Sequence, residues 1–164
     1  MFKKEDFVIN SNNGICQIQD IQKMNMSGIS KDYYVLVPIA EATAKIYIPV
    51  DVAENRIRLV MTKTEAENII QSISTIDEIW IENEREREAT YKDALASRDP
   101  KRLVSIIKTL YLRKKERLDA GKKNTAVDER YFKLAENMLH AELAFALGED
   151  KQNINNIIVS HITK

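Results

Sequence analysis

The sequence predicts an α+β protein in which a small antiparallel sheet or barrel precedes a helical domain. In the first sixty residues, short runs alternate apolar with polar or aromatic residues and are separated by turn residues. Beyond residue 61, apolar residues recur at intervals of three and four, as on one face of a helix. A chain of 164 residues is long enough for one large or two small domains. We therefore expect domain boundaries of 1–61 and 62–164.

Five short strands are expected in the first domain. Turn residues in "NSNNG" (10–14) and at Ser27-Gly28 separate the first three, and Pro38 and Pro49 punctuate the third and fourth. Five strands in about sixty residues favour a strongly bent sheet or barrel. The expected strands cover 7–9, 15–21, 32–39, 45–50 and 57–60.

Two capping boxes predict the first helices of the second domain. Thr64 with Glu67 would begin a short helix, and Thr75 with Glu78 would begin another. No glycine or proline interrupts the chain from there to about Ser97, so the second helix is expected to run that far. It would carry the only tryptophan, Trp80.

Three more helices are expected before the end of the chain. Asp99-Pro100 combines an N-cap with a first-turn proline, and Gly121 would end that helix. Thr125 with Asp128 begins the next, which closes at Gly148. The last helix is expected from the spacing of Ile154, Ile157, Ile158 and Ile162.

Composition argues against several classes of protein. The only cysteine, Cys16, has no nearby histidine, and the four glycines are scattered, so neither a metal site, a nucleophile nor a phosphate-binding loop is predicted. We expect no enzyme, no cofactor and no small-molecule substrate. The apolar runs are too short to span a membrane, and the first residues lack a signal peptide's apolar middle. A soluble, cytoplasmic protein is expected.

Positive charge is concentrated in one region although the net charge is zero. Residues 98–123 hold 10 basic and 3 acidic side chains, a local charge of 10 − 3 = +7. Such a region attracts phosphates, and a solvated helix face is the alternative interpretation. Lys101, Lys108 and Lys115 are seven residues apart, so they lie nearly in line on the helix. This arrangement suits contacts to the DNA backbone better than reading of bases.

Several segments, taken in order, resemble the CarD family of bacterial transcription regulators, including its CdnL-type members. The resemblance covers nearly the whole chain, and it lies in the order of several modest motifs. They are "NGICQIQDI" (13–21), "YYVLVPI" (33–39), "KIYIPVD" (45–51), "IRLV" (57–60), "YKDAL" (91–95), "LVSIIKTLYLRKKER" (103–117) and "KLAENMLHAELAFALG" (133–148).

The resemblance implies two binding surfaces. Family members bind the β subunit of RNA polymerase through an N-terminal Tudor-like barrel, by edge-strand pairing. Their helical domain contacts promoter DNA at the upstream edge of the transcription bubble, largely at the backbone and minor groove, where a tryptophan inserts. The candidate polymerase contacts are Met24, Lys45 and Tyr47. The candidate DNA contacts are Trp80, Arg85, Arg87, Lys92, Lys108, Arg113, Lys114, Lys115 and Arg117.

The sequence departs from the family pattern around Trp80. In the family the inserted tryptophan lies about one helical turn before the Tyr-Lys pair, where this chain has Arg87. Trp80 lies eleven residues before Tyr91, and glutamates at 82, 84, 86 and 88 would repel phosphate. Packing of Trp80 between barrel and helices, beside Ile76 and Ile79, is the alternative role.

Two functions follow from these expectations. The first is a transcription regulator that tethers to RNA polymerase and holds promoter DNA, so that the open complex persists. The alternative is an adaptor on RNA polymerase that has lost DNA binding because of the acidic run 82–88. A monomer is expected, and exchange of strands to form a dimer is left open.

Overall fold

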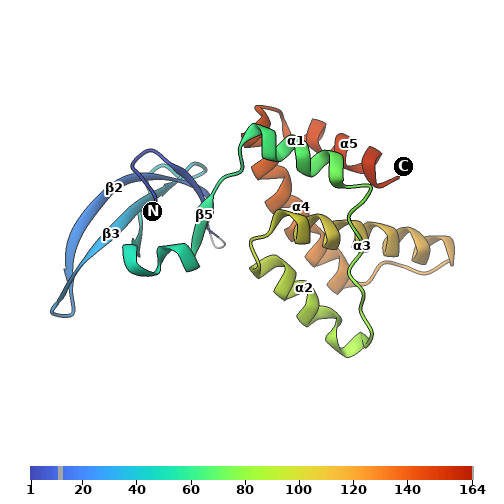
Figure 1. Ribbon diagram of the computed structural model, residues 1–164. Coiled ribbons are helices and arrows are strands. Elements are labelled where there is room, and N and C mark those ends of the chain that lie inside the picture. Colours follow the sequence, from blue (N-terminus) through green and yellow to red (C-terminus); the bar gives the residue numbers. More distant parts are fainter. Residues whose placement is uncertain (11–12, 164) are drawn as a thin grey trace. The chain divides into compact units, whose positions relative to one another are not determined.

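The computed structural model describes residues 1–10 and 13–163 and divides into two compact units, Met1–Val60 and Met61–Lys164 (Figure 1). The first unit contains the strands and the second the helices. The predicted α+β class is therefore confirmed. Each unit is described by itself.

The first unit is a five-stranded antiparallel sheet with strand order β4-β3-β2-β1-β5. A 3-10 helix, η1 (Val50–Asn55), connects β4 to β5. In the part of the chain that the structure describes, β4 and β5 lie at opposite edges and do not pair, so the sheet is not closed and the expected barrel is not confirmed. The predicted turn at 10–14 includes residues 11 and 12, which lie outside the described residues. The strands are β1 (Phe7–Asn10), β2 (Gly14–Met26), β3 (Ile29–Pro38), β4 (Ile46–Pro49) and β5 (Ile57–Leu59).

The hairpin of β2 and β3 is longer than the sequence predicts. Its register shifts between Ile18 and Asp20, and pairing then continues to Met26 and Ile29 at the Ser27-Gly28 turn. Most side chains in this outer part of the hairpin are exposed, so they show no alternation of buried and exposed residues that would predict a strand. The core lies instead on the rest of the sheet and on η1, and it is built from Val8, Cys16, Ile18, Tyr34, Leu36, Ile48, Ala53 and Ile57.

The second unit contains five α-helices, and several of its predicted ends are confirmed. Asp99 caps α3 by accepting the Lys101 N–H at 3.0 Å, and Thr125 caps α4 by accepting the Asp128 N–H at 3.1 Å. Gly148 ends α4 in the left-handed conformation, with φ 66°. The helices are α1 (Lys63–Ser72), α2 (Arg87–Ala96), α3 (Pro100–Asp119), α4 (Ala126–Leu147) and α5 (Lys151–Ile162), with a 3-10 turn η2 (Glu84–Glu86) before α2.

Two helix predictions are wrong. The first helix is capped by Thr62 and Glu65 rather than by Thr64 and Glu67: the Thr62 hydroxyl accepts the Glu65 N–H at 3.1 Å, and the Glu65 carboxylate accepts the Thr62 N–H at 2.8 Å. The helix expected from 75 to 97 begins only at Arg87, because residues 75–83 are not helical and Glu84–Glu86 form a 3-10 turn. Long-range contacts with α3, described below, hold these residues in a non-helical path despite their helical propensity.

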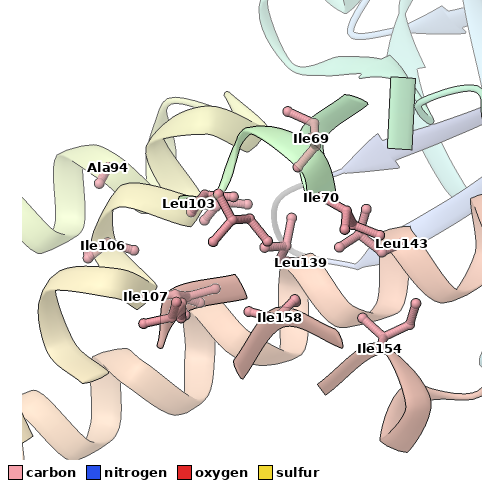
Figure 2. Close-up of a cluster of buried hydrophobic side chains, with 14 of the residues drawn as sticks. Ile69, Ile70, Ala94, Leu103, Ile106, Ile107, Leu139, Leu143, Ile154 and Ile158 are labelled. Carbon is pink, nitrogen blue, oxygen red and sulfur yellow. The ribbon is translucent and has the colours of Figure 1, made fainter. Parts of the chain in front are cut away.

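Apolar side chains from all five helices meet in one core (Figure 2). Both ends of the second unit contribute to it, since α1 and α5 each pack against α4. None of the helices described is both long and apolar enough to cross a membrane. The labelled core residues in Figure 2 are Ile69, Ile70, Ala94, Leu103, Ile106, Ile107, Leu139, Leu143, Ile154 and Ile158.

His140, which is 5% exposed on α4, makes the stability of the helical unit depend on pH. Burial, with a smaller effect of Lys151, lowers its pKa from 6.5 to about 4. The unfolded chain therefore binds more protons between these values, and the free energy of unfolding should fall by about 1–3 kcal/mol as the pH drops from 7 to 4.5. Chemical denaturation at several pH values measures this. His140→Gln should make the free energy of unfolding depend less on pH above pH 4.5. An unchanged pH dependence in this variant would show that His140 is not its cause.

Candidate functional site

The outer edge of β4 carries two of the three candidate polymerase contacts. β4 pairs with β3 through Val35 and Tyr47, and no described strand pairs on its other side. Tyr47 is 39% exposed, and Lys45 is exposed just before β4 begins. Met24 is half-buried on β2, paired with Lys31 beyond the end of β4. The structure thus groups Lys45 and Tyr47 at one edge and places Met24 in the outer hairpin.

Trp80 lies outside the helical core. Its side chain is 86% exposed, whereas Ile79 and Ile81 on either side are partly buried against the core. The Ile79 N–H donates to the Thr109 hydroxyl at 2.8 Å. Within the helical unit, Ile76 and Ile79 pack against the core, and Trp80 does not join them there. Because residues 77–83 are not helical, Trp80 and Tyr91 do not lie on one continuous helix.

A buried carboxylate connects α2, α3 and α4. Asp128, 1% exposed, accepts the Tyr91 hydroxyl at 2.9 Å and the Arg113 Nε–H at 2.7 Å. Arg87 donates to the Tyr91 oxygen at 3.0 Å and binds both carboxylate oxygens of Glu84, at 2.8 and 2.7 Å. Burial raises the pKa of Tyr91, which keeps its hydroxyl a donor to the carboxylate. Two candidate DNA contacts, Arg87 and Arg113, are therefore bound inside the domain.

The sequence alone predicts Asp128 only as a helix-capping partner of Thr125. Its position one turn before Tyr131 and Phe132 places it on the side of the helix that faces the core. That position indicates its second role, as a buried acceptor. A carboxylate in such a position needs a basic or hydroxyl partner when it is buried. The sequence could therefore have predicted a buried network here, although not which arginine supplies the charge.

A second network neutralises Glu88. Arg130 binds one Glu88 oxygen at 2.6 Å, and the Tyr131 hydroxyl donates to the same oxygen at 2.9 Å. The Tyr131 hydrogen bond is the main cause that lowers the pKa of Glu88, and the Arg87 contact does the same for Glu84. Two of the four glutamates after Trp80 are thus compensated by basic side chains, which reduces the repulsion of phosphate that the sequence suggests.

Lys108, a third candidate DNA contact, is also bound inside the domain. Its ammonium donates to the backbone oxygens of Ile73 at 3.0 Å, Ser74 at 3.3 Å and Ile76 at 2.9 Å. These carbonyls follow the end of α1, where helical partners are lacking and a cation is favoured.

The remaining candidates are more accessible. Lys92 and Lys114 approach Glu88 and Glu129 only at 4.0 and 3.9 Å, with side chains 66% and 44% exposed. Arg117 is partly exposed and donates to the Lys123 carbonyl at 3.0 Å. Arg85 and Lys115 are exposed. Lys114, Lys115 and Arg117 share the second half of α3.

Comparison with known proteins identifies the first unit. Residues 2–61 match the family model of the CarD-like/TRCF RID domain. The N-terminal unit is a CarD-like/TRCF RID domain. The resemblance to the CarD family is confirmed for these residues, and the match ends where the helical unit begins. RID domains of this family bind the β subunit of RNA polymerase, and the family is one of protein-interaction domains rather than catalytic ones. The search of curated proteins found no match.

Asp128→Ala tests the energetic importance of the buried network. Removing the carboxylate leaves Arg113 and the Tyr91 hydroxyl without their buried acceptor, so the free energy of unfolding should fall by about 3 kcal/mol. Urea denaturation measures the loss. Lys92→Met, which removes only an exposed ion pair, is the control and should change stability by less than about 0.5 kcal/mol. Equal effects of the two substitutions would contradict the network's role.

Proposed function

We propose that this protein is a transcription regulator that binds the RNA polymerase β subunit through its RID domain and promoter DNA through its helical domain. It stabilises the open promoter complex and catalyses no reaction. The observation that carries this proposal is the family match over residues 2–61. The exposed Trp80 and the basic second half of α3 support the DNA contact.

The polymerase contact is assigned to the outer edge of β4. An unpaired edge strand offers backbone N–H and C=O groups that another protein's strand can complete. Tyr47 and Lys45 add an exposed ring and a cation beside that edge. Met24 contributes from the outer hairpin.

The DNA contact is assigned to Trp80 together with Arg85, Lys92, Lys114, Lys115 and Arg117. Arg87, Lys108 and Arg113 act instead by holding the elements that carry these residues, because all three have partners within the domain. An exposed indole suits insertion beside unstacked bases, which offsets an unstacking cost of a few kcal/mol.

The second candidate function is an adaptor that binds RNA polymerase without DNA. Arg87, Lys108 and Arg113 are bound inside the domain, and Glu82 and Glu86 remain exposed close to Trp80 in the sequence. The affinity for DNA distinguishes the two functions. A regulator that contacts phosphates should lose DNA affinity steeply as salt is added, whereas an adaptor should not bind DNA at any salt concentration.

Tyr47→Ala tests the polymerase contact. An aromatic residue at the centre of an interface typically contributes 1–2 kcal/mol or more, so affinity for the isolated β subunit should fall about 5- to 30-fold. Surface plasmon resonance measures the dissociation constant. Leu59→Ala, on β5 at the opposite edge and 53% exposed, is the control and should bind normally. If only the Leu59 variant loses binding, the polymerase contact lies at the β5 edge, and its assignment to β4 is wrong.

A Lys114/Lys115/Arg117 triple alanine variant tests the DNA contact. With polymerase holoenzyme and labelled upstream-fork promoter DNA, wild type should raise DNA retention, measured by fluorescence anisotropy. The triple variant should lose this effect. The slope of log affinity for DNA against log salt concentration should also become shallower by about 2–3, since each phosphate contact contributes about 0.9 to that slope.

The control removes the same charge elsewhere, in a Lys63/Lys133/Lys151 triple alanine variant, whose side chains are also exposed. If the Lys114/Lys115/Arg117 variant still raises DNA retention, or if both triple variants lose it equally, the assigned DNA contact is wrong. The adaptor function would then replace it.

A further inference from the structure

We infer that Lys108 and Thr109, adjacent residues of α3, are positioning residues that fix the segment 73–81 and hold the Trp80 indole outside the core. This inference rests on the proposed function for its partner, a base step of promoter DNA, but the positioning itself is a property of the free protein. It assigns a role to the non-helical segment after α1.

Lys108 fixes the beginning of the segment. A lysine ammonium has three N–H donors, and in this chain they reach three backbone oxygens, those of Ile73, Ser74 and Ile76. These oxygens lie 32 to 35 residues away in sequence, so the contacts join α3 to the segment rather than stabilising α3 itself. All three acceptors belong to the turn that leaves α1, which directs the chain toward Trp80.

Thr109 fixes the residue next to Trp80. Its hydroxyl donates to the Ser105 carbonyl at 2.6 Å, so its oxygen is oriented to accept the Ile79 N–H at 2.8 Å. Thr109 is only 7% exposed, and water therefore competes poorly for this hydrogen bond.

The side chains around Trp80 determine where it points. Ile79 and Ile81 pack against the helical core, so the chain on both sides of Trp80 is fixed to it. Trp80 is 86% exposed, the highest exposure among the large apolar side chains after Met1. A large, rigid indole held in this way loses little conformational freedom when a partner binds it.

Trp80 is the only tryptophan, so its fluorescence reports on the segment directly. Time-resolved anisotropy of the free protein should show more nanosecond motion of the indole in Thr109→Val and in Lys108→Met than in wild type. Thr109→Ser keeps the hydroxyl and should restore the wild-type decay. Lys133→Met, an exposed lysine on α4, is the control and should also match wild type.

Hydrogen exchange gives a test that does not depend on Trp80. The Ile79 amide should be protected in wild type and should exchange about tenfold faster in Thr109→Val. An unprotected Ile79 amide in wild type would overturn the inference without any variant. Unchanged anisotropy decay in both Thr109→Val and Lys108→Met would overturn it as well.

DNA retention on polymerase holoenzyme separates this inference from the proposed function. If Trp80→Ala retains upstream-fork DNA as wild type does, the tryptophan–DNA contact fails, whatever the mobility measurements show. If Trp80→Ala loses retention, folded Thr109→Val and Lys108→Met should weaken it too, and Thr109→Ser should not. Full retention in variants whose indole is mobile would overturn the positioning role while leaving the DNA contact intact.

Discussion

The helical unit depends on one buried carboxylate, that of Asp128. Its two oxygens accept hydrogen bonds from Tyr91 on α2 and Arg113 on α3, so one side chain of α4 connects both helices to α4. Arg87 extends the contact to Glu84, immediately before α2. The chain between α1 and α2 is thus held at its far end by this network and at its near end by Lys108 on α3. Residues 77–83 pass between two fixed points, and a continuous helix through them is not formed.

This arrangement explains why a lone tryptophan lies among charged residues. Glu84 and Glu88 look like a barrier to phosphate in the sequence, yet their main partners are Arg87 and the Arg130–Tyr131 pair. Glu84, Arg87 and Glu88 thus help to maintain the fold of the helical unit, whereas Glu82, Arg85 and Glu86 are exposed. Accessible positive charge lies instead on the second half of α3 and on exposed residues of α2 and the turn before it. Charges with partners inside the domain and accessible charges therefore occur in the same sequence region but belong to different side chains.

The sequence predicts those features of the fold that depend on residues close together in the chain. The change from strands to helices near residue 61, the caps at Asp99 and Thr125 and the stop at Gly148 follow from turn and capping chemistry. The outer hairpin was missed because its exposed residues carry no burial pattern, and the break after α1 was missed because its cause lies 32 to 35 residues away. Charge and spacing alone grouped Lys108 and Arg113 with binding residues, since a sequence does not show which cations have internal partners.

The proposed function requires that Trp80, which lies outside the core, contacts promoter DNA while the N-terminal unit is bound to RNA polymerase. The most direct measurement is photocrosslinking from p-benzoyl-phenylalanine incorporated at position 80, in a complex of holoenzyme, this protein and promoter DNA. The same label at Leu134, 46% exposed on α4, is the control. The account predicts a crosslink to DNA near the upstream edge of the bubble from position 80 and none from position 134. Crosslinks from position 80 to polymerase alone, or equal DNA crosslinks from both positions, would contradict it.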